Sequence, residues 1–195
     1  MNATIGMSGY PAARLSSFYF FYYAVLGAFT PYWSLYLESR GLGVTAISVL
    51  MSLWYATRIV SPSLWTTLAA RSPQPIRWLH LGCALAVGSF ALFLLPWNYV
   101  GLFVVMTAFC FAYTAVLPKF ESITMSHLAA RSDRYGLIRV WGSIGFIVVV
   151  ASFGWLIDAR RLGIGALPWL MLPVLAAVLG SALINRYAHD PDASR

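Results

Sequence analysis

Apolar segments of membrane-spanning length fill most of this chain and restrict its fold to one class. A helix needs about 20 consecutive apolar residues to cross a bilayer, and the sequence holds six apolar segments near that length. Short turns with Gly, Pro and Arg separate these segments and leave no room for a soluble domain. We therefore predict an all-α membrane protein whose six transmembrane helices form a bundle over residues 15–186. The expected helices cover about 15–37, 45–69, 78–95, 99–125, 137–157 and 166–186.

The composition agrees with a membrane protein and argues against other classes. Hydrophobic residues make up 60% of the chain and charged residues 10%, whereas soluble domains carry about 25% charged residues. The net charge of +7 comes from basic residues scattered between the apolar segments, without the basic stripe or the motifs of nucleic-acid-binding proteins. We expect a lipid bilayer around the chain and no nucleic-acid partner.

The residues that usually carry metal or redox chemistry are few and scattered. Cys83 and Cys110 lie in apolar segments without redox or metal-ligand spacing, so we expect two buried thiols that act as small hydrophobes. The three histidines form no pair at metal-ligand spacing, and no hydrolase or phosphate-binding motif occurs. We predict no enzyme, no cofactor and no metal site; His80, on an apolar segment, is expected to be a packing residue.

The basic residues of the turns predict the orientation in the membrane, because cytoplasmic loops carry an excess of Lys and Arg. Seven basic residues lie in the two tails and in the second and fourth loops, against three in the other loops. We therefore expect an inner-membrane protein with both tails, 1–14 and 187–195, in the cytoplasm. Four tryptophans near the expected helix ends suit the interfacial belt: Trp33, Trp97, Trp155 and Trp169.

Two opposite charges interrupt the fourth and fifth segments. Glu121 lies about ten residues before the turn expected near 129–133, and Arg139 lies about eight residues after it. In an antiparallel hairpin the two side chains then lie at nearly the same depth. A charge within the hydrocarbon costs a few kcal/mol, so such groups usually face a bundle interior and pair. The spacing predicts an ion pair.

The residues alone leave the role of this pair open. It is a structural lock between two helices, or it is part of a binding site. A carboxylate beside an arginine can couple proton uptake to the arrival of a ligand, because burial and the neighbouring charge act on its proton affinity in opposite directions. Arginine also offers a planar fork to an anionic or hydroxylated solute. Lys119 points to another side of the helix, and we expect it to extend to the cytoplasmic surface.

Two further residues are candidates for the same site. Arg58 lies near the middle of the second segment, about 18 Å from the nearest interface by helix rise, and needs an interior partner or water. Tyr23 shares a helix face with Gly27 and Thr30 in an aromatic first segment, and its hydroxyl is suited to line a cavity. Structural and functional roles remain open for Arg58.

Three sequence stretches resemble the N-terminal half of major facilitator transporters. They are PYWSLYLESRGL at 31–42, RIVSPSLWTTLAAR at 58–71 and YGLIRVWGSIGF at 135–146. Within this superfamily the chain looks most similar to the 3-phenylpropionic acid transporter group, which is related to lactose permease and to nucleoside:proton symporters. The resemblance covers nearly the whole chain. It implies one half of a major facilitator fold, built from two inverted three-helix repeats.

The resemblance also implies roles for the polar residues. In the lactose permease branch, a Glu and an Arg at the positions of Glu121 and Arg139, with the same spacing, hold the substrate. The 3-phenylpropionic acid transporter group more often has Asp at the position of Glu121, and it has an Arg at the position of Arg58. One feature is missing here: Ala70 stands where the family's second cytoplasmic loop has an Asp that helps to lock helix ends.

The resemblance further implies what the chain does and what it requires. We expect proton-coupled uptake of a small organic solute, an aromatic carboxylate or a sugar- or nucleoside-like molecule, with Glu121, Arg139, Arg58 and Tyr23 lining the cavity. The family has twelve spans in two halves, so we expect transport to need a C-terminal half or a second copy in a homodimer. The alternative is a truncated, non-transporting membrane remnant or an assembly subunit.

Overall fold

Six α-helices make up most of the described part of the chain, which comprises residues 12–70, 72, 75–128, 135–158 and 162–185 of a computed structural model. No β-strand occurs in those ranges. Lipid offers no hydrogen-bond partners, so an apolar chain of this kind satisfies its backbone within helices. They are α1 (Ala12–Ser39), α2 (Val44–Ala70), α3 (Pro75–Ala91), α4 (Tyr99–Leu128), α5 (Tyr135–Asp158) and α6 (Leu167–Ile184), with short 3-10 turns η1 (Leu92–Leu94) and η3 (Ile164–Ala166).

Five of the described helices are long and apolar enough to cross a membrane. They are α2, α4 and α5, together with α3 and α6 extended by their 3-10 turns. The helix α1 is not among them, because its tyrosines, serines and proline lower its hydropathy. The chain is therefore a multi-pass membrane protein, and the expected sixth span stays a prediction.

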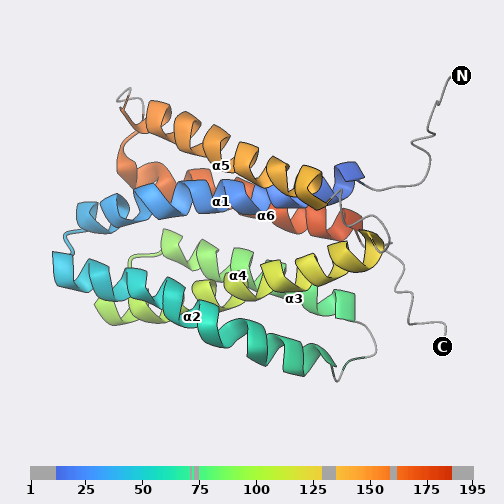
Figure 1. Ribbon diagram of the computed structural model, residues 1–195. Helices are drawn as coiled ribbons and strands as arrows, with labels where there is room; N and C mark the ends of the chain where they lie inside the picture. The colour runs from blue at the N-terminus through green and yellow to red at the C-terminus, as the bar shows by residue number, and fades with distance from the viewer. Residues whose placement is uncertain (1–11, 71, 73–74, 129–134, 159–161, 186–195) are drawn as a thin grey trace, which may run out of the picture.

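The helices form two groups of three (Figure 1). In one group α1 packs along α5 and α6, and in the other α4 packs along α2 and α3, while α3 and α6 join the groups. The hairpin expected from the sequence is antiparallel, but α4 and α5 pack mainly against other helices rather than against each other. Its expected turn near 129–133 lies outside the described residues.

The first and last helices meet at one end of the bundle, where α1 begins and α6 ends (Figure 1). There the Asn185 amide donates a hydrogen bond to the Arg14 carbonyl oxygen at 3.1 Å. At the opposite end α1 ends at Ser39, and Gly41 in the turn that follows has a φ of 81°, in the left-handed region that favours glycine. Most of the tail residues, and most of the loop arginines on which the orientation rests, lie outside the described residues, so the cytoplasmic placement of both ends stays a prediction.

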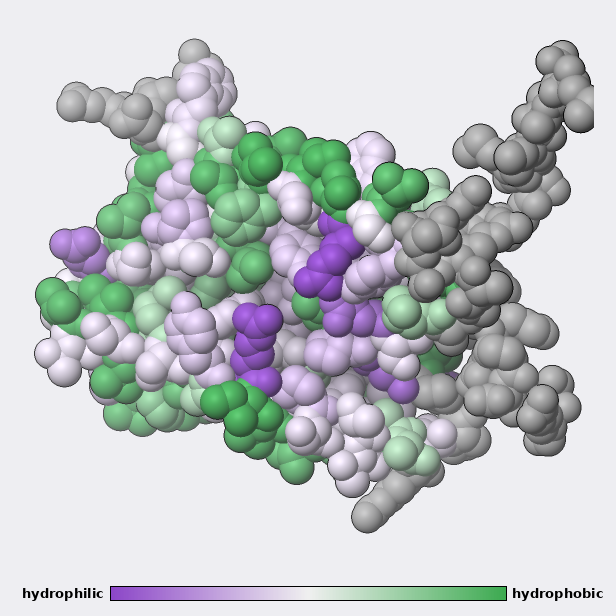
Figure 2. Space-filling model, in the orientation of Figure 1, coloured by the Kyte–Doolittle hydropathy of each residue, from purple (hydrophilic) through white to green (hydrophobic). Residues whose placement is uncertain are grey.

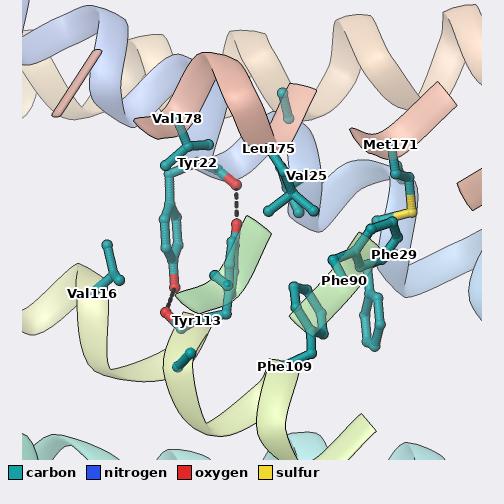
Figure 3. Packing of buried hydrophobic residues seen from close by; sticks show 14 of the residues in the cluster. Tyr22, Val25, Phe29, Phe90, Phe109, Tyr113, Val116, Met171, Leu175 and Val178 are labelled. Carbon is teal, nitrogen blue, oxygen red and sulfur yellow. Dashed lines mark hydrogen bonds between the residues drawn. The ribbon is translucent and has the colours of Figure 1, made fainter. Parts of the chain in front are cut away.

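Aromatic side chains fill the contact between the two groups (Figure 3). Tyr22 of α1 and Tyr113 of α4 stack with ring centroids 4.5 Å apart, and each hydroxyl donates to the other residue's carbonyl oxygen. The prediction that Trp33 belongs to an interfacial belt is wrong: its side chain is fully buried against Phe90 and Phe93. The reason is that α3 and η1, which carry these two phenylalanines, cover this part of α1.

Candidate functional site

The ion pair expected from the sequence is present between α4 and α5. The Nη1 atom of Arg139 donates to Oε1 of Glu121 at 2.6 Å. The side chain of Arg139 is 46% exposed and that of Glu121 is 30% exposed. The pair therefore lies on an open face of the six helices.

Two tyrosines complete the surroundings of Arg139. Its Nη2 donates to the hydroxyl of Tyr23 on α1 at 3.1 Å, and its Nη1 also donates to the hydroxyl of Tyr135 at 2.7 Å. The Tyr135 hydroxyl in turn donates to Oε1 of Glu121 at 3.2 Å. The sequence interpretation named Tyr23 but missed Tyr135. Its position four residues before Arg139 on the same helix face was the available signal.

A cavity of about 270 Å³ opens beside the pair. It brings together all four residues that the sequence singled out, because Tyr23, Arg58, Glu121 and Arg139 all line it. The helices α1, α2, α4 and α5 contribute to it, so it lies where the two groups of three meet. The remaining walls are mainly apolar or aromatic: Tyr22, Leu26, Trp54, Pro62, Thr114, Leu117 and Pro118.

Hydrophilic side chains gather on this face between α5 and α2, within a surface that is otherwise pale or apolar (Figure 2). Arg58 is exposed on this part of α2. Among the described residues it makes neither an ion pair nor a hydrogen bond. The cavity thus holds two arginines and one carboxylate, and only Arg139 is neutralised.

The unused hydrogen-bonding groups show what this site can hold. Arginine has five N–H donors, and the described bonds of Arg139 involve only Nη1 and one bond from Nη2. Oxygen Oε2 of Glu121 and the whole guanidinium of Arg58 have no bond among the described residues. The site therefore offers many donors and few acceptors to a solute, which favours anionic or hydroxylated groups.

A glycine on α5 makes room for Tyr23. A Cβ atom added at Gly142 would lie 2.5 Å from the Cδ2 atom of the Tyr23 ring, closer than such contacts allow. Gly142 lies three residues after Arg139, on the same face of α5. The absence of a side chain there lets the Tyr23 ring lie against α5, with its hydroxyl within reach of Arg139.

We expect Gly142→Ala to loosen Arg139 by displacing the Tyr23 ring. A hydrogen bond to a charged group contributes about 1.5–3 kcal/mol. We therefore expect phenylglyoxal to modify Arg139 about tenfold faster or more, measured on the Arg139 peptide by mass spectrometry. Gly136→Ala is the matched control, because an added Cβ there meets nothing within 4 Å. Equal rates in the two variants would contradict this role of Gly142.

Three other residues lie where the sequence indicated packing roles. His80 shares a hydrogen bond of 3.1 Å between Nε2 and the Ala182 carbonyl oxygen, as expected for a satisfied packing residue. Cys83 and Cys110 are free and buried. Lys119 does not line the cavity. Within the described residues, no group of His, Cys, Asp and Glu could hold a metal ion.

Comparison with known proteins gives consistent matches over this region. The model of the MFS_1 like family matches residues 12–193. Maltose permease of Geobacillus stearothermophilus is 32% identical over 168 residues, which are 85% of this chain and 42% of that protein. The probable 3-phenylpropionic acid transporter of Escherichia coli is 26% identical over 142 residues, 71% of this chain and 37% of that protein.

A third relative, an uncharacterized transporter YwbF of Bacillus subtilis, is 29% identical over 145 residues, 73% of this chain and 36% of that protein. The chain thus spans about two fifths of the length of the curated relatives it matches. No solved structure gives a significant match.

Proposed function

Because the chain belongs to the MFS_1 like family of major facilitator transporters, we propose that it forms the N-terminal, six-helix half of a secondary transporter for a small organic anion. The solute binds in the cavity between α1, α2, α4 and α5 and crosses the inner membrane by alternating access. The observation that carries the proposal is the cavity itself, with a neutralised Arg139, an unneutralised Arg58 and aromatic walls.

The packing of the helices supports two inverted three-helix repeats. In such a pair of repeats α1 corresponds to α4, α2 to α5 and α3 to α6. This correspondence converts one packed group, α1 with α5 and α6, into the other, α4 with α2 and α3. The contacts between α1 and α5 become those between α4 and α2. Tyr22 and Tyr113 bond to each other's carbonyl oxygens, and such reciprocal contacts characterise a two-fold relation.

The solute class follows from the charges of the cavity. An uncompensated arginine at membrane depth is costly, and a carboxylate supplies both the opposite charge and two acceptors for its fork. Trp54 and Tyr22 provide aromatic walls for an apolar body, and a cavity of about 270 Å³ suits a small one. An aromatic monocarboxylate fits these features better than a neutral sugar. One relative's name specifies 3-phenylpropionic acid and another's maltose.

Glu121 is the group that couples transport to protons in this proposal. It is the carboxylate that lines the cavity, and it can hold either a proton or the Arg139 guanidinium. The solute thereby gains access to Arg139 when Glu121 is protonated. In this proposal all six helices span the membrane, and protons move in the same direction as the solute. The start of α1 and the end of α6 lie on the cytoplasmic side.

A second transmembrane domain or subunit is required to close the cavity. Arg58 and Arg139 are exposed on one open face, and alternating access needs a wall that moves relative to them. In this proposal, a C-terminal half or a second copy of the chain forms that wall. The competing function, a non-transporting subunit, predicts that neutral residues at 121 and 139 change no solute flux.

Arg58→Gln tests the solute class. In the full-length protein we expect binding of 3-phenylpropionate to weaken about tenfold or more, since a charge-assisted hydrogen bond contributes about 1.5–3 kcal/mol. Arg58→Lys should retain part of the affinity, because it keeps the charge but loses the fork. Equilibrium dialysis with the labelled carboxylate measures both, with 3-phenylpropionamide as the uncharged control ligand. Equal losses for acid and amide, or tight binding of maltose instead, would refute the anion.

A further inference from the structure

The hydroxyl of Tyr135 is the one group in the described site that bonds to both members of the ion pair. Tyr135 is the first residue of α5. Its hydroxyl accepts from Arg139 at 2.7 Å and donates to Glu121 at 3.2 Å. Its ring packs edge-on against Tyr19 of α1, with centroids 6.4 Å apart. The hydroxyl is therefore held in place from a third helix.

Tyr135 does not line the cavity, although Glu121 and Arg139 do. A solute in the cavity thus meets the pair directly and Tyr135 only through it. The second hydroxylated neighbour, Tyr23, lines the cavity and bonds to Arg139 without a described bond to Glu121. The two tyrosines therefore have different positions relative to a solute.

A hydroxyl can donate and accept at once, and this property separates Tyr135 from the two charged residues. When Glu121 takes up a proton, its attraction for Arg139 falls. The bond that Arg139 donates to the Tyr135 oxygen does not depend on that charge. The hydroxyl can hold the guanidinium in either protonation state of the carboxylate.

We propose that Tyr135 is a positioning residue that keeps Arg139 at the cavity wall while Glu121 is protonated. This proposal rests on the proposed proton-coupled function. It names the residue that contacts Arg139 both when Glu121 is charged and when Glu121 is protonated. Arg139 is thereby presented to the solute in the state in which its charge is no longer neutralised. Without the hydroxyl, protonation of Glu121 would leave Arg139 with Tyr23 and a weaker, uncharged bond to the protonated carboxyl group as its contacts among the described residues.

Several groups act on Glu121 from the neighbouring helices. From α5 these are Arg139 and Tyr135. From α1 they are Tyr19, Tyr22 and Tyr23, and from α2 Arg58 faces the same cavity. Because none of these except Tyr135 contacts both charged residues, the effect of its hydroxyl can be separated by substitution.

Comparison of Tyr135→Phe in two backgrounds tests the proposal without any solute. Glu121→Gln mimics the protonated carboxylate and keeps its size. In the full-length protein we expect Tyr135→Phe to accelerate phenylglyoxal modification of Arg139 only slightly when Glu121 is present. In the Glu121→Gln background we expect an acceleration of about tenfold, the amount that one bond to a charged group contributes. Peptide mass spectrometry resolves Arg139 from the other arginines.

Equal accelerations in the two backgrounds, or none in either, would overturn the proposal, because a merely structural tyrosine acts in both alike. Tyr55→Phe is the control, since Tyr55 is exposed on α2 and does not line the cavity. A second measurement concerns the labelled carboxylate: the KM of uptake in Tyr135→Phe should rise more at low pH than at high pH. If Tyr135→Phe accelerates the modification of Arg139 mainly in the Glu121→Gln background but the protein transports no solute, the inference is supported and the proposed function is refuted.

Discussion

Replacing Arg139 with Ala is expected to weaken solute binding about 100-fold, because one bond to a charged group contributes about 1.5–3 kcal/mol and 1.4 kcal/mol corresponds to a factor of ten. The guanidinium donates to Glu121 and to two tyrosines and faces the cavity with its remaining donors. Its loss removes a contact to the solute and leaves the carboxylate of Glu121 without its counterion.

Uptake and equilibrium binding of the labelled carboxylate measure this effect. Arg139→Lys should recover little, because a lysine cannot reach three acceptors with a planar fork. The matched control is Arg77→Ala, which removes an exposed arginine of α3 outside the cavity. If Arg139→Ala and Glu121→Gln both bind and transport as the unaltered protein does, the ion pair is a helix lock and the site lies elsewhere.

The second large effect concerns the contact between α1 and α5, which places Tyr23 beside Arg139. A Cβ at Gly27 would lie 2.6 Å from the Phe146 carbonyl oxygen, and a Cβ at Gly145 would overlap the Phe20 carbonyl oxygen. These neighbours are backbone atoms and cannot rotate away, so the helices must separate. Overpacking of this kind costs about 1–3 kcal/mol per site.

We therefore expect Gly27→Ala and Gly145→Ala each to lower the melting temperature of the detergent-solubilised protein, and the double variant to lower it further. Small residues let membrane helices approach closely, and the resulting van der Waals packing contributes to their association. Gly88→Ala and Gly180→Ala are the controls, because an added Cβ at either position meets nothing within 4 Å. Identical melting temperatures for Gly145→Ala and Gly180→Ala would contradict the close contact.

The sequence predicted the helices because spanning length and hydropathy depend only on local composition. Each expected segment overlaps one observed helix, and the fourth extends beyond its expected end to Leu128. The ion pair was also predictable, since helix rise relates sequence distance to depth. The packing of α1 between α5 and α6 was not, because it depends on glycine contacts between segments far apart in the chain.

Contacts between distant segments also explain why the sequence analysis missed Tyr135 and misplaced Trp33. Tyr135 has no unusual neighbours in the sequence, and its importance follows only from the orientation of its hydroxyl between Glu121 and Arg139. Trp33 has the sequence position of an interfacial residue, but its burial depends on α3 and η1, whose Phe90 and Phe93 contact its ring. Side chains that act across helices cannot be assigned from one helix alone.

The most direct test of the central claim is uptake by proteoliposomes that contain the full-length protein under an imposed pH gradient, acidic outside. We predict that the labelled carboxylate accumulates above the level reached in protein-free liposomes, that its uncharged amide does not, that Glu121→Gln abolishes this excess and that Arg58→Gln lowers it. An undiminished excess in both variants, or no excess over protein-free liposomes in the unaltered protein, would contradict a proton-coupled anion site formed by these residues.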